Sequence, residues 1–597
     1  MSANSLTRRL SDLEAARYRF GPTEAAHVLK LLSMLDVAHF PDPPSLIRFH
    51  EALMFLRAFP QNPSVLRKTE SLLNHFWKKV DALRRSGADM DAFDPLEVSG
   101  IAGTTMEDTL SFDVARWLVR RLPGQVEIAW ENYDPGRELG TTGPRFMPLL
   151  EDDAYVEADT PWRRWLETAA GKKDSDPAWP LATWLVQRFA DLPLPPIEKA
   201  ELYESLRVPL RWDLGSSRVS RTRNFLSPSR TLSSRATRKE RSDRGESRDL
   251  AFLAPQSVFY HDGPLISRSE VSLARELAKR PPTFTKLSRR QGEAVIDTIR
   301  EVMLVRYREL YGTTLGDPSS VVRADVGRGI TIHLWNLPAE RRLPLRSYVA
   351  GLTLKNGVPI NYIEAIGLCE WMEVGFNTFY TFRGGEAGWI YAQVLRCLCH
   401  LMGTTCVSVY PYQLGHDNEE AIESGAFWFY RKLGFRPGRA DLRRLVERAE
   451  QKIVTDRNYR TPPRTLKRLA AGHVFYELPG SEVTAWDKFS TRNIGLRVNR
   501  RLARNFGGDA GRMRAYAKRA LERILGVRTR SWTPLEKVAF ENFAVVLELV
   551  NLRAWARKEK EDLLEIIRAK AKPDEMLYLH LTQQHDRLRE ALLRIGF

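Results

Sequence analysis

A short stretch near the middle of the chain combines an arginine, several glycines and a carboxylate in a pattern that could hold an anion. Residues 379–388 have the sequence Phe-Tyr-Thr-Phe-Arg-Gly-Gly-Glu-Ala-Gly, and an apolar run from Trp389 to Met402 follows, ending before Gly403. This pattern predicts a strand, a Gly-rich turn and a helix. Such a junction directs unpaired backbone N–H groups and the positive end of the helix dipole toward an anion. The alternative is a tight turn that needs two glycines only for its backbone angles.

A second motif follows about forty residues later. Residues 425–437 have the sequence Gly-Ala-Phe-Trp-Phe-Tyr-Arg-Lys-Leu-Gly-Phe-Arg-Pro. The first motif resembles the pyrophosphate loop of the GNAT superfamily of N-acyltransferases, with the pattern (Gln/Arg)-x-x-Gly-x-(Gly/Ala). The second motif resembles the late helix of that family and its exit at Leu433-Gly434-Phe435. A β-branched strand predicted at Thr404 to Tyr410 lies between the two motifs, as the family order requires.

The resemblance implies a binding site for acyl-CoA, in a cleft between splayed strands. Arg383 and backbone N–H groups of the loop would contact the diphosphate, and a guanidinium adds charge-assisted donors. The loop residues concerned are Gly384, Gly385, Ala387 and Gly388. Tyr430 matches the general acid of the family, which protonates the departing thiolate of CoA. The alternative for Tyr430 is packing, because it ends a run of four aromatic residues, Phe427 to Tyr430.

A general base is also implied, since an acyltransferase must remove a proton from the substrate ammonium. In this family the base is often a glutamate on or near the strand before the loop. Glu364, Glu370 and Glu373 are the candidates, and desolvation inside a cleft would raise the pKa of such a carboxyl group toward the working range. Each of the three could equally lie on a solvated face.

The chain departs from the family pattern at two cofactor positions. Glu386 stands where the loop usually has its first glycine, and a carboxylate beside a diphosphate is repelled unless a cation intervenes. Glu423 stands where an asparagine commonly supports the cofactor, and Asn418 lies five residues earlier. We therefore expect either a divergent enzyme or a fold that has been kept for another purpose.

Two other kinds of site are less well supported. The acidic cluster from His416 to Glu420 has no second histidine at ligand spacing, and acidic residues at the start of a helix are explained by capping and the helix dipole. We expect no metal. All four cysteines lie between residues 369 and 406, and Cys397 and Cys399 would not share a helix face. They are expected to be reduced, buried thiols.

The positive charge of the chain is concentrated in two segments. The net charge is +17, of which residues 216–248 contribute +7 and residues 488–530 contribute +11, so the remainder is close to neutral. An anionic macromolecule, such as nucleic acid or an acidic protein, is expected to bind at these segments. Few aromatic residues accompany the charges, which disfavours stacking on single-stranded bases.

Length and composition indicate a multidomain protein. The chain has 597 residues with 43% hydrophobic content, which predicts two to four domains. We predict a mainly helical N-terminal domain at 1–214, an Arg/Ser-rich flexible linker or loop at 215–249, a GNAT-like domain at 250–480 and a basic helical region at 481–597. The start of the chain has no apolar signal-peptide region and no apolar run is long enough to span a membrane, so a cytoplasmic location is expected.

The predicted fold class is α+β or α/β, with a GNAT-like mixed β-sheet and flanking helices in the centre and mainly helical terminal regions. A helix is predicted from about residue 289 to residue 310, followed by strand pairs around Gly327-Arg-Gly329 and Lys355-Asn-Gly357. A late strand is predicted at residues 473–478. The family resemblance therefore covers about residues 282–479.

Two functions follow as expectations. The first is an N-acyltransferase that moves an acyl group, acetyl or longer, from acyl-CoA to an amine of an unknown acceptor. The second is a catalytically inactive GNAT-like fold that acts as a binding or scaffolding protein for nucleic acid or an acidic protein. The identities of Glu386 and Glu423 distinguish the two hypotheses.

Overall fold

The structure is a computed structural model of the chain, and it describes residues 3–93, 98, 100–102, 105–133, 164, 167, 180–213 and 260–597. The predicted Arg/Ser-rich segment at 215–249, including the basic residues 216–248, lies outside the described residues. The described chain forms two compact units. The first contains residues 1–264, 293–315 and 356–359, and the second contains residues 265–292, 316–355 and 360–597.

The first unit is mainly helical, as predicted for the N-terminal region. A small antiparallel sheet has the order β1 (Thr105–Asp108), β3 (Leu210–Asp213), β2 (Val126–Ile128), and the side chains of Val126, Leu210 and Trp212 are buried there. Most of α15 (Arg289–Leu304) belongs to this unit. The remaining described helices of the unit are α1 (Ala3–Ala16), α2 (Pro22–Asp36), α3 (Pro43–Ala58), α4 (Pro63–Asn74), α5 (Phe76–Arg85), α6 (Phe112–Arg121), α10 (Leu181–Asp191), α11 (Pro196–Glu204) and α16 (Tyr311–Thr314).

The second unit is built on a nine-stranded mixed sheet. Its strand order is β11-β12-β10-β9-β8-β7-β6-β5-β4. The strands are β4 (Phe284–Lys286), β5 (Val322–Gly327), β6 (Ile330–Asn336), β7 (Ser347–Lys355), β8 (Val358–Leu368), β9 (Trp371–Thr378), β10 (Cys406–Val409), β11 (Arg436–Pro437) and β12 (Val474–Glu477). The pair β9–β10 is parallel, whereas β8–β9 and β10–β12 are antiparallel. The predicted combination of a large mixed sheet with helices is therefore confirmed.

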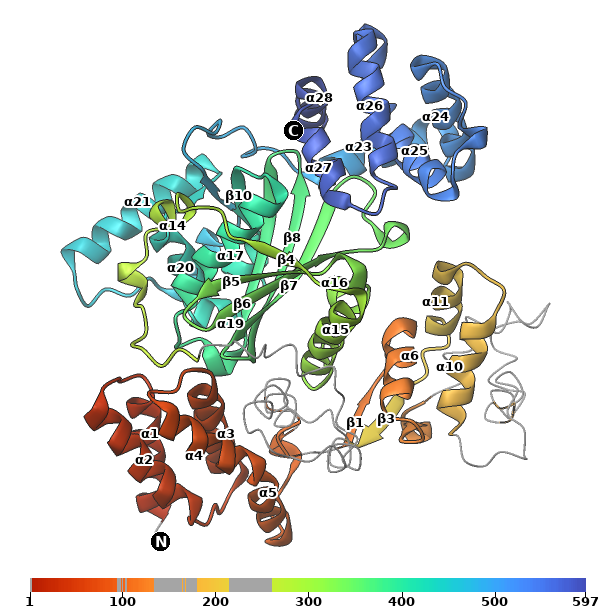
Figure 1. The fold of residues 1–597 in the computed structure, drawn as a ribbon. Coiled ribbons are helices and arrows are strands. Elements are labelled where there is room, and N and C mark those ends of the chain that lie inside the picture. Colours follow the sequence, from red (N-terminus) through yellow and green to blue (C-terminus); the bar gives the residue numbers. More distant parts are fainter. Residues whose placement is uncertain are drawn as a thin grey trace. The chain divides into compact units, whose positions relative to one another are not determined.

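A buried helix connects the two parallel strands. Helix α17 (Ala387–Met402) is apolar on most of its circumference, as expected for a helix covered on several sides. It ends at Gly403, which adopts the left-handed φ of 64° at the C-cap position. On its outer side Gln393 donates a buried hydrogen bond of 2.8 Å to Glu276 in α14 (Leu273–Leu277). Figure 1 shows α14, α17, α20 (Ala426–Lys432) and α21 (Ala440–Thr455) together on one side of the sheet.

The C-terminal helices form a bundle that shares a hydrophobic core with the sheet. Leu368, Trp371 and Phe475 of the sheet belong to the same buried cluster as Phe543 and Leu592 of the bundle. The helices are α23 (Thr491–Phe506), α24 (Ala510–Leu525), α25 (Pro534–Leu547), α26 (Arg557–Ala569), α27 (Glu575–Gln583) and α28 (Asp586–Gly596). Because sheet and bundle share a core, the structure groups the predicted region 481–597 with the sheet.

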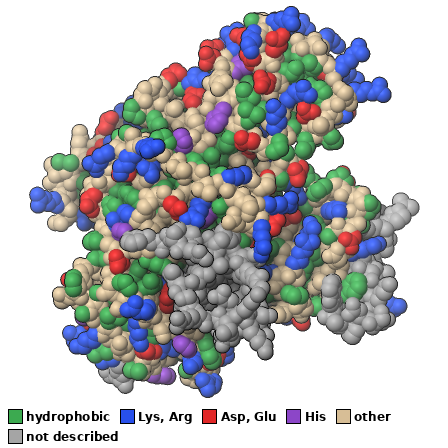
Figure 2. Space-filling view, in the orientation of Figure 1, with side chains coloured by type: hydrophobic (Ala, Val, Ile, Leu, Met, Phe, Trp, Pro, Cys, Tyr) green, Lys and Arg blue, Asp and Glu red, His purple; other side chains and the backbone are tan. Residues whose placement is uncertain are grey.

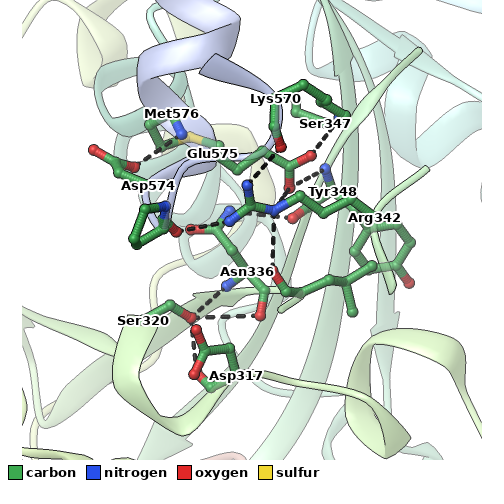
Figure 3. A network of polar contacts seen from close by, with 12 residues as sticks. Asp317, Ser320, Asn336, Arg342, Ser347, Tyr348, Lys570, Asp574, Glu575 and Met576 are labelled. Carbon is green, nitrogen blue, oxygen red and sulfur yellow. Dashed lines mark hydrogen bonds and ion pairs between the residues drawn. The ribbon is translucent and has the colours of Figure 1, made fainter. Parts of the chain in front are cut away.

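A buried polar network also joins the bundle to the sheet (Figure 3). Glu575, at the start of α27, accepts a 2.5 Å hydrogen bond from Lys570 and lies 3.8 Å from the guanidinium of Arg342. Arg342 in turn donates to the backbone oxygens of Lys570 (2.9 Å) and Pro573 (2.7 Å). The backbone N–H of Tyr348 in β7 donates to Glu575 over 3.4 Å. Each charge in this network therefore has an opposite charge or a hydrogen-bond partner, as buried charges require.

One buried histidine in the sheet makes a testable contribution to acid stability. His333 in β6 is 1% exposed, and burial, together with the nearby charge of Arg323, lowers its pKa to about 3. Between about pH 6.5 and 3 the unfolded chain therefore binds a proton that the folded chain does not, so this residue makes stability fall as the pH decreases.

The free energy of unfolding decreases between pH 7 and pH 5, and we expect this decrease to be about 2 kcal/mol smaller for His333→Leu than for the wild type. The measurement is urea unfolding of the wild type and the variant at both pH values. His416→Leu is the matched control, because the His416 side chain is about half exposed (54%). An identical pH dependence for wild type and His333→Leu would contradict the prediction.

Candidate functional site

The predicted strand, Gly-rich turn and helix are present in the order expected. Strand β9 is followed by a 3-10 turn at Tyr380–Phe382, then by residues 383–386 and α17. The N–H of Gly385 donates to the carbonyl of Phe382 over 3.0 Å, and the N–H of Ile390 donates to the carbonyl of Glu386 over 2.9 Å. The N–H groups of residues 387–389 precede this first intrahelical bond, so they have no acceptor within the helix.

The carboxylate of Glu386 lies inside the protein beside two cations. Glu386 is 0% exposed and accepts a 2.8 Å hydrogen bond from Nε of Arg328, with a second, shorter contact to Nη2. The backbone N–H of Ile266 donates to the same oxygen over 3.0 Å, and Nζ of Lys355 lies 3.5 Å from the other oxygen. Burial lowers the pKa of Lys355 to about 8, although the charge of Glu386 opposes this shift. The site is thus an anion site in which the anion is a side chain of the protein.

One of these cations, Arg328, lies on a strained turn. Gly327, Arg328 and Gly329 all have left-handed φ angles, of 89°, 52° and 66°, at the tip between β5 and β6. A non-glycine residue in this region is held there only when its surroundings determine it. Nζ of Lys355 donates to the carbonyl of Arg328 over 2.6 Å and so fixes this turn. Neither cation was expected from the sequence, although the Gly-Arg-Gly triplet indicates an arginine on a tight turn.

The N-terminus of α17 is covered by the segment that precedes α14. A Cβ atom added to Gly388 would lie 3.2 Å from Cγ of Arg268. Together with the hydrogen bond from Ile266 to Glu386, this contact places residues 266–268 over the first turn of the helix. The lack of a side chain at Gly388 therefore leaves room for the close approach of the protein's own chain.

Arg383 and the two predicted support residues lie close together beyond the turn. The guanidinium of Arg383 forms a 2.7 Å ion pair with Glu420 and donates to the carbonyl of Thr378 over 3.3 Å. Glu420 belongs to α19 (Glu419–Glu423). Asn418 caps this helix by accepting from the N–H of Ala421 (3.2 Å). Glu423 and Gly384 are exposed. The loop and α19 are therefore adjacent, and Arg383 is already paired with a carboxylate.

Tyr430 lies where β9 and β10 separate. The parallel register joins Trp371–Glu373 to Cys406–Ser408 and stops there. Beyond this point, Oε1 of Gln413 accepts hydrogen bonds from the N–H of Phe376 (3.2 Å) and the hydroxyl of Tyr430 (3.3 Å). Tyr430 is 4% exposed, and burial raises its pKa above the ordinary value. Gln413 therefore fills the opening between the strands; no sequence signal had distinguished it.

The three candidate bases do not form a common site. Glu364 bonds to the hydroxyl of Tyr348, and burial raises its pKa, which that hydrogen bond opposes. Glu373 contacts His473 (3.0 Å) and Arg346 (3.8 Å).

Register places Glu364 opposite Gly375 and Glu373 opposite Ile366, so the two carboxylates share a sheet face. Phe376 is on the other face, where its ring contacts Tyr391 of α17. Both carboxylates are therefore separated from α17 by the sheet.

Glu370 lies at the opposite end of β9 from the Gly-rich turn, roughly 25 Å away along the strand. Its carboxylate accepts from Trp486 (2.8 Å) and from Arg589 (2.7 Å). It therefore contributes to packing between the sheet and the C-terminal bundle, and the structure does not bring it to the loop.

Comparisons with known proteins do not assign a family or a function to this chain. No protein-family model matches the sequence, and no curated protein or solved structure is significantly similar to it. Within the described ranges, none of the helices combines the length and the apolar character needed to cross a membrane.

Proposed function

We propose that this chain has a GNAT-like fold that does not use acyl-CoA and acts as a binding or scaffolding protein for a polyanionic partner. The family resemblance is supported by the parallel pair β9–β10, by α17 as its connection and by the strands β12 and β11 that extend the sheet beyond β10. The opening between β9 and β10 also agrees with the splayed strands that the family resemblance implies. These features support the fold, whereas the local chemistry decides between the two functions.

The buried carboxylate of Glu386 is the observation that carries the proposal. A diphosphate bound at this turn would need the positive charges of Arg328 and Lys355, both of which already pair with Glu386. The diphosphate would also be repelled by that carboxylate, because both carry negative charge. Displacing the carboxylate from its buried partners would cost several kcal/mol. Residues 266–268 cover the same end of α17.

The opening between the strands supports the same conclusion. An acyl-CoA chain lying between β9 and β10 would compete with Gln413 for the N–H of Phe376. It would also have to separate Gln413 from Tyr430. Tyr430 therefore has a packing and hydrogen-bonding role that does not require catalysis.

The acyltransferase hypothesis is tested by calorimetric titration of the full chain with acetyl-CoA and with long-chain acyl-CoA. We expect no saturable heat for the wild type, and the same result for Arg383→Ala and Tyr430→Phe. Saturable binding that Arg383→Ala weakens would contradict the proposal and would restore the enzyme hypothesis.

A further inference from the structure

Helices α23 and α24 carry ten of the thirteen basic residues of the segment 488–530. They are joined by Gly507 and Gly508, which have left-handed φ angles of 60° and 88°. Ile494, Met513, Ala517 and Leu521 are buried in the C-terminal bundle. The apolar face of α24 and Ile494 of α23 are thus used for folding, and the polar faces of both helices remain at the surface. Figure 2 shows Lys and Arg side chains along the outer edge of the C-terminal helices.

The carboxylates of this segment do not neutralise its surface charge. Asp509 caps α24 by accepting from the N–H of Arg512 over 2.8 Å. Glu522 accepts hydrogen bonds from the N–H (3.0 Å) and the hydroxyl (2.6 Å) of Thr529. Both acidic residues therefore have structural roles.

Eleven of the thirteen cations fall into two groups, and the other two, Arg497 and Arg514, donate hydrogen bonds to the backbone oxygen of Phe597 (3.2 Å) and to Oδ1 of Asn542 (3.4 Å). Arg501 and Lys518 form ion pairs with Glu548 (2.6 Å) and Glu541 (2.8 Å). Nine others are exposed and form no ion pair with any described residue. These are Lys488, Arg492, Arg500, Arg504, Arg512, Arg519, Arg523, Arg528 and Arg530. The surface therefore has a large uncompensated positive charge.

The arginines of α24 form a row. Arg512, Arg519 and Arg523 are spaced by seven and four residues, with the exposed Tyr516 between the first two, so all four lie within one face of the helix. The row spans about 16 Å, since a helix rises about 1.5 Å per residue. One strand of a duplex has a phosphate about every 3.4 Å along the axis, so the row is long enough to reach more than one phosphate.

The chemistry of the surface favours phosphate over other anions. Eleven of the thirteen cations in residues 488–530 are arginines, whose planar guanidinium groups bind phosphate oxygens in a bidentate manner. Tyr516 is the one strongly exposed aromatic residue on these two helices, which is too few for a stacking platform on single-stranded bases. An amphipathic membrane helix would need an apolar face at the surface, but Tyr516 is the only strongly exposed large apolar side chain on α23 and α24, whose residues are all described.

We infer that α23 and α24 form a binding surface for the phosphate backbone of a double-stranded nucleic acid. This inference rests on the proposed function, for which it names the partner. Binding is independent of sequence, because the contacts are to phosphates and no groove-reading element accompanies them among the described residues of this surface. It is also strongly dependent on salt, since each phosphate contact releases counterions.

The test is fluorescence anisotropy of the full chain with a labelled DNA duplex of about 20 base pairs, longer than the arginine row. An RNA duplex of the same sequence is titrated in parallel, with salt varied between about 50 and 300 mM. The variant replaces Arg500, Arg504, Arg519 and Arg523 with glutamine. We expect the slope of log K against log salt to become shallower by about four, and affinity at 0.1 M salt to fall more than about 100-fold.

A matched control replaces four exposed arginines of the same unit, Arg444, Arg448, Arg457 and Arg464, with glutamine. It changes the net charge equally and is expected to retain the wild-type slope. The inference is overturned if the wild type binds neither duplex, if the control loses as much affinity as the variant, or if polyglutamate or phosphatidylserine vesicles bind more tightly than the duplexes. A negative duplex result leaves the acyl-CoA titration unaffected, so failure of this inference is distinguishable from failure of the proposed function.

Discussion

Replacing Glu386 with glycine is expected to lower the free energy of unfolding of the sheet-containing unit by about 3–5 kcal/mol, because it removes the buried carboxylate that pairs with the buried Lys355 and with Arg328. Lys355 is 1% exposed, and Arg328 is held in a left-handed conformation beside it. Both cations form ion pairs with Glu386. The measurement is urea unfolding followed by tryptophan fluorescence.

The same variant is expected to acquire sensitivity to added anions. Removing the side chain of Glu386 opens space beside Arg328 and Lys355, and an anion that binds only the folded state stabilises it by mass action. Pyrophosphate and CoA should therefore raise the melting temperature of Glu386→Gly but not that of the wild type. Sodium chloride at equal ionic strength separates specific binding from screening.

Glu423→Gly is the control for these two measurements, because Glu423 is an exposed carboxylate at the end of α19. Its loss is expected to change the free energy of unfolding by less than about 1 kcal/mol, since surface substitutions have small effects. Equal stability losses for Glu386→Gly and Glu423→Gly would show that the buried cluster is unimportant. Stabilisation of the wild type by CoA would show that Glu386 does not exclude it.

The substitution Glu575→Gln is expected to cost about 3–5 kcal/mol, because it breaks the buried network that joins the C-terminal bundle to the sheet. Glu575 is 0% exposed, and burial lowers the pKa of its partner Lys570 while the charge of Glu575 opposes that shift. Without the carboxylate, Lys570 and Arg342 both lose the buried group with which they pair (Figure 3).

Glu565→Gln is the matched control on α26, since Glu565 is exposed. The measurement is urea unfolding together with hydrogen exchange of α27 and β7, because local opening should precede global unfolding. We expect faster exchange in both elements for Glu575→Gln and wild-type exchange for Glu565→Gln. Indistinguishable behaviour of the two variants would mean that the hydrophobic core alone holds the bundle to the sheet.

The sequence predicted the local structure around the candidate site well, because that structure depends on short-range patterns. The Gly-rich turn, the apolar helix that ends at Gly403 and the strand before Tyr410 are all present close to their predicted bounds. The tight turns at Gly327-Arg-Gly329 and Asn356-Gly357 are confirmed by their left-handed φ angles. Glycine and asparagine tolerate these angles at little cost, so the residues alone indicate the turns.

The sequence also identified Glu386 as the residue that conflicts with a diphosphate, since a carboxylate at that point is unfavourable whatever surrounds it. It could not identify what neutralises that carboxylate. Arg328 and Lys355 are separated from it by 58 and 31 residues, and only the pairing of β5, β6 and β7 brings them to the start of α17. Long-range contacts of this kind leave no local pattern.

For the basic segment 488–530, too, some features could be predicted from the sequence and others depended on the tertiary structure. Its charge and amphipathic pattern were evident from the residues, whereas the tertiary structure decided which cations are paired and which remain exposed. The sequence by itself therefore determined where turns, helices and charge occur along the chain. The packing of distant elements determined that the anion site is filled from within and that the free positive charge lies on α23 and α24, because burial and ion pairing depend on neighbours in space.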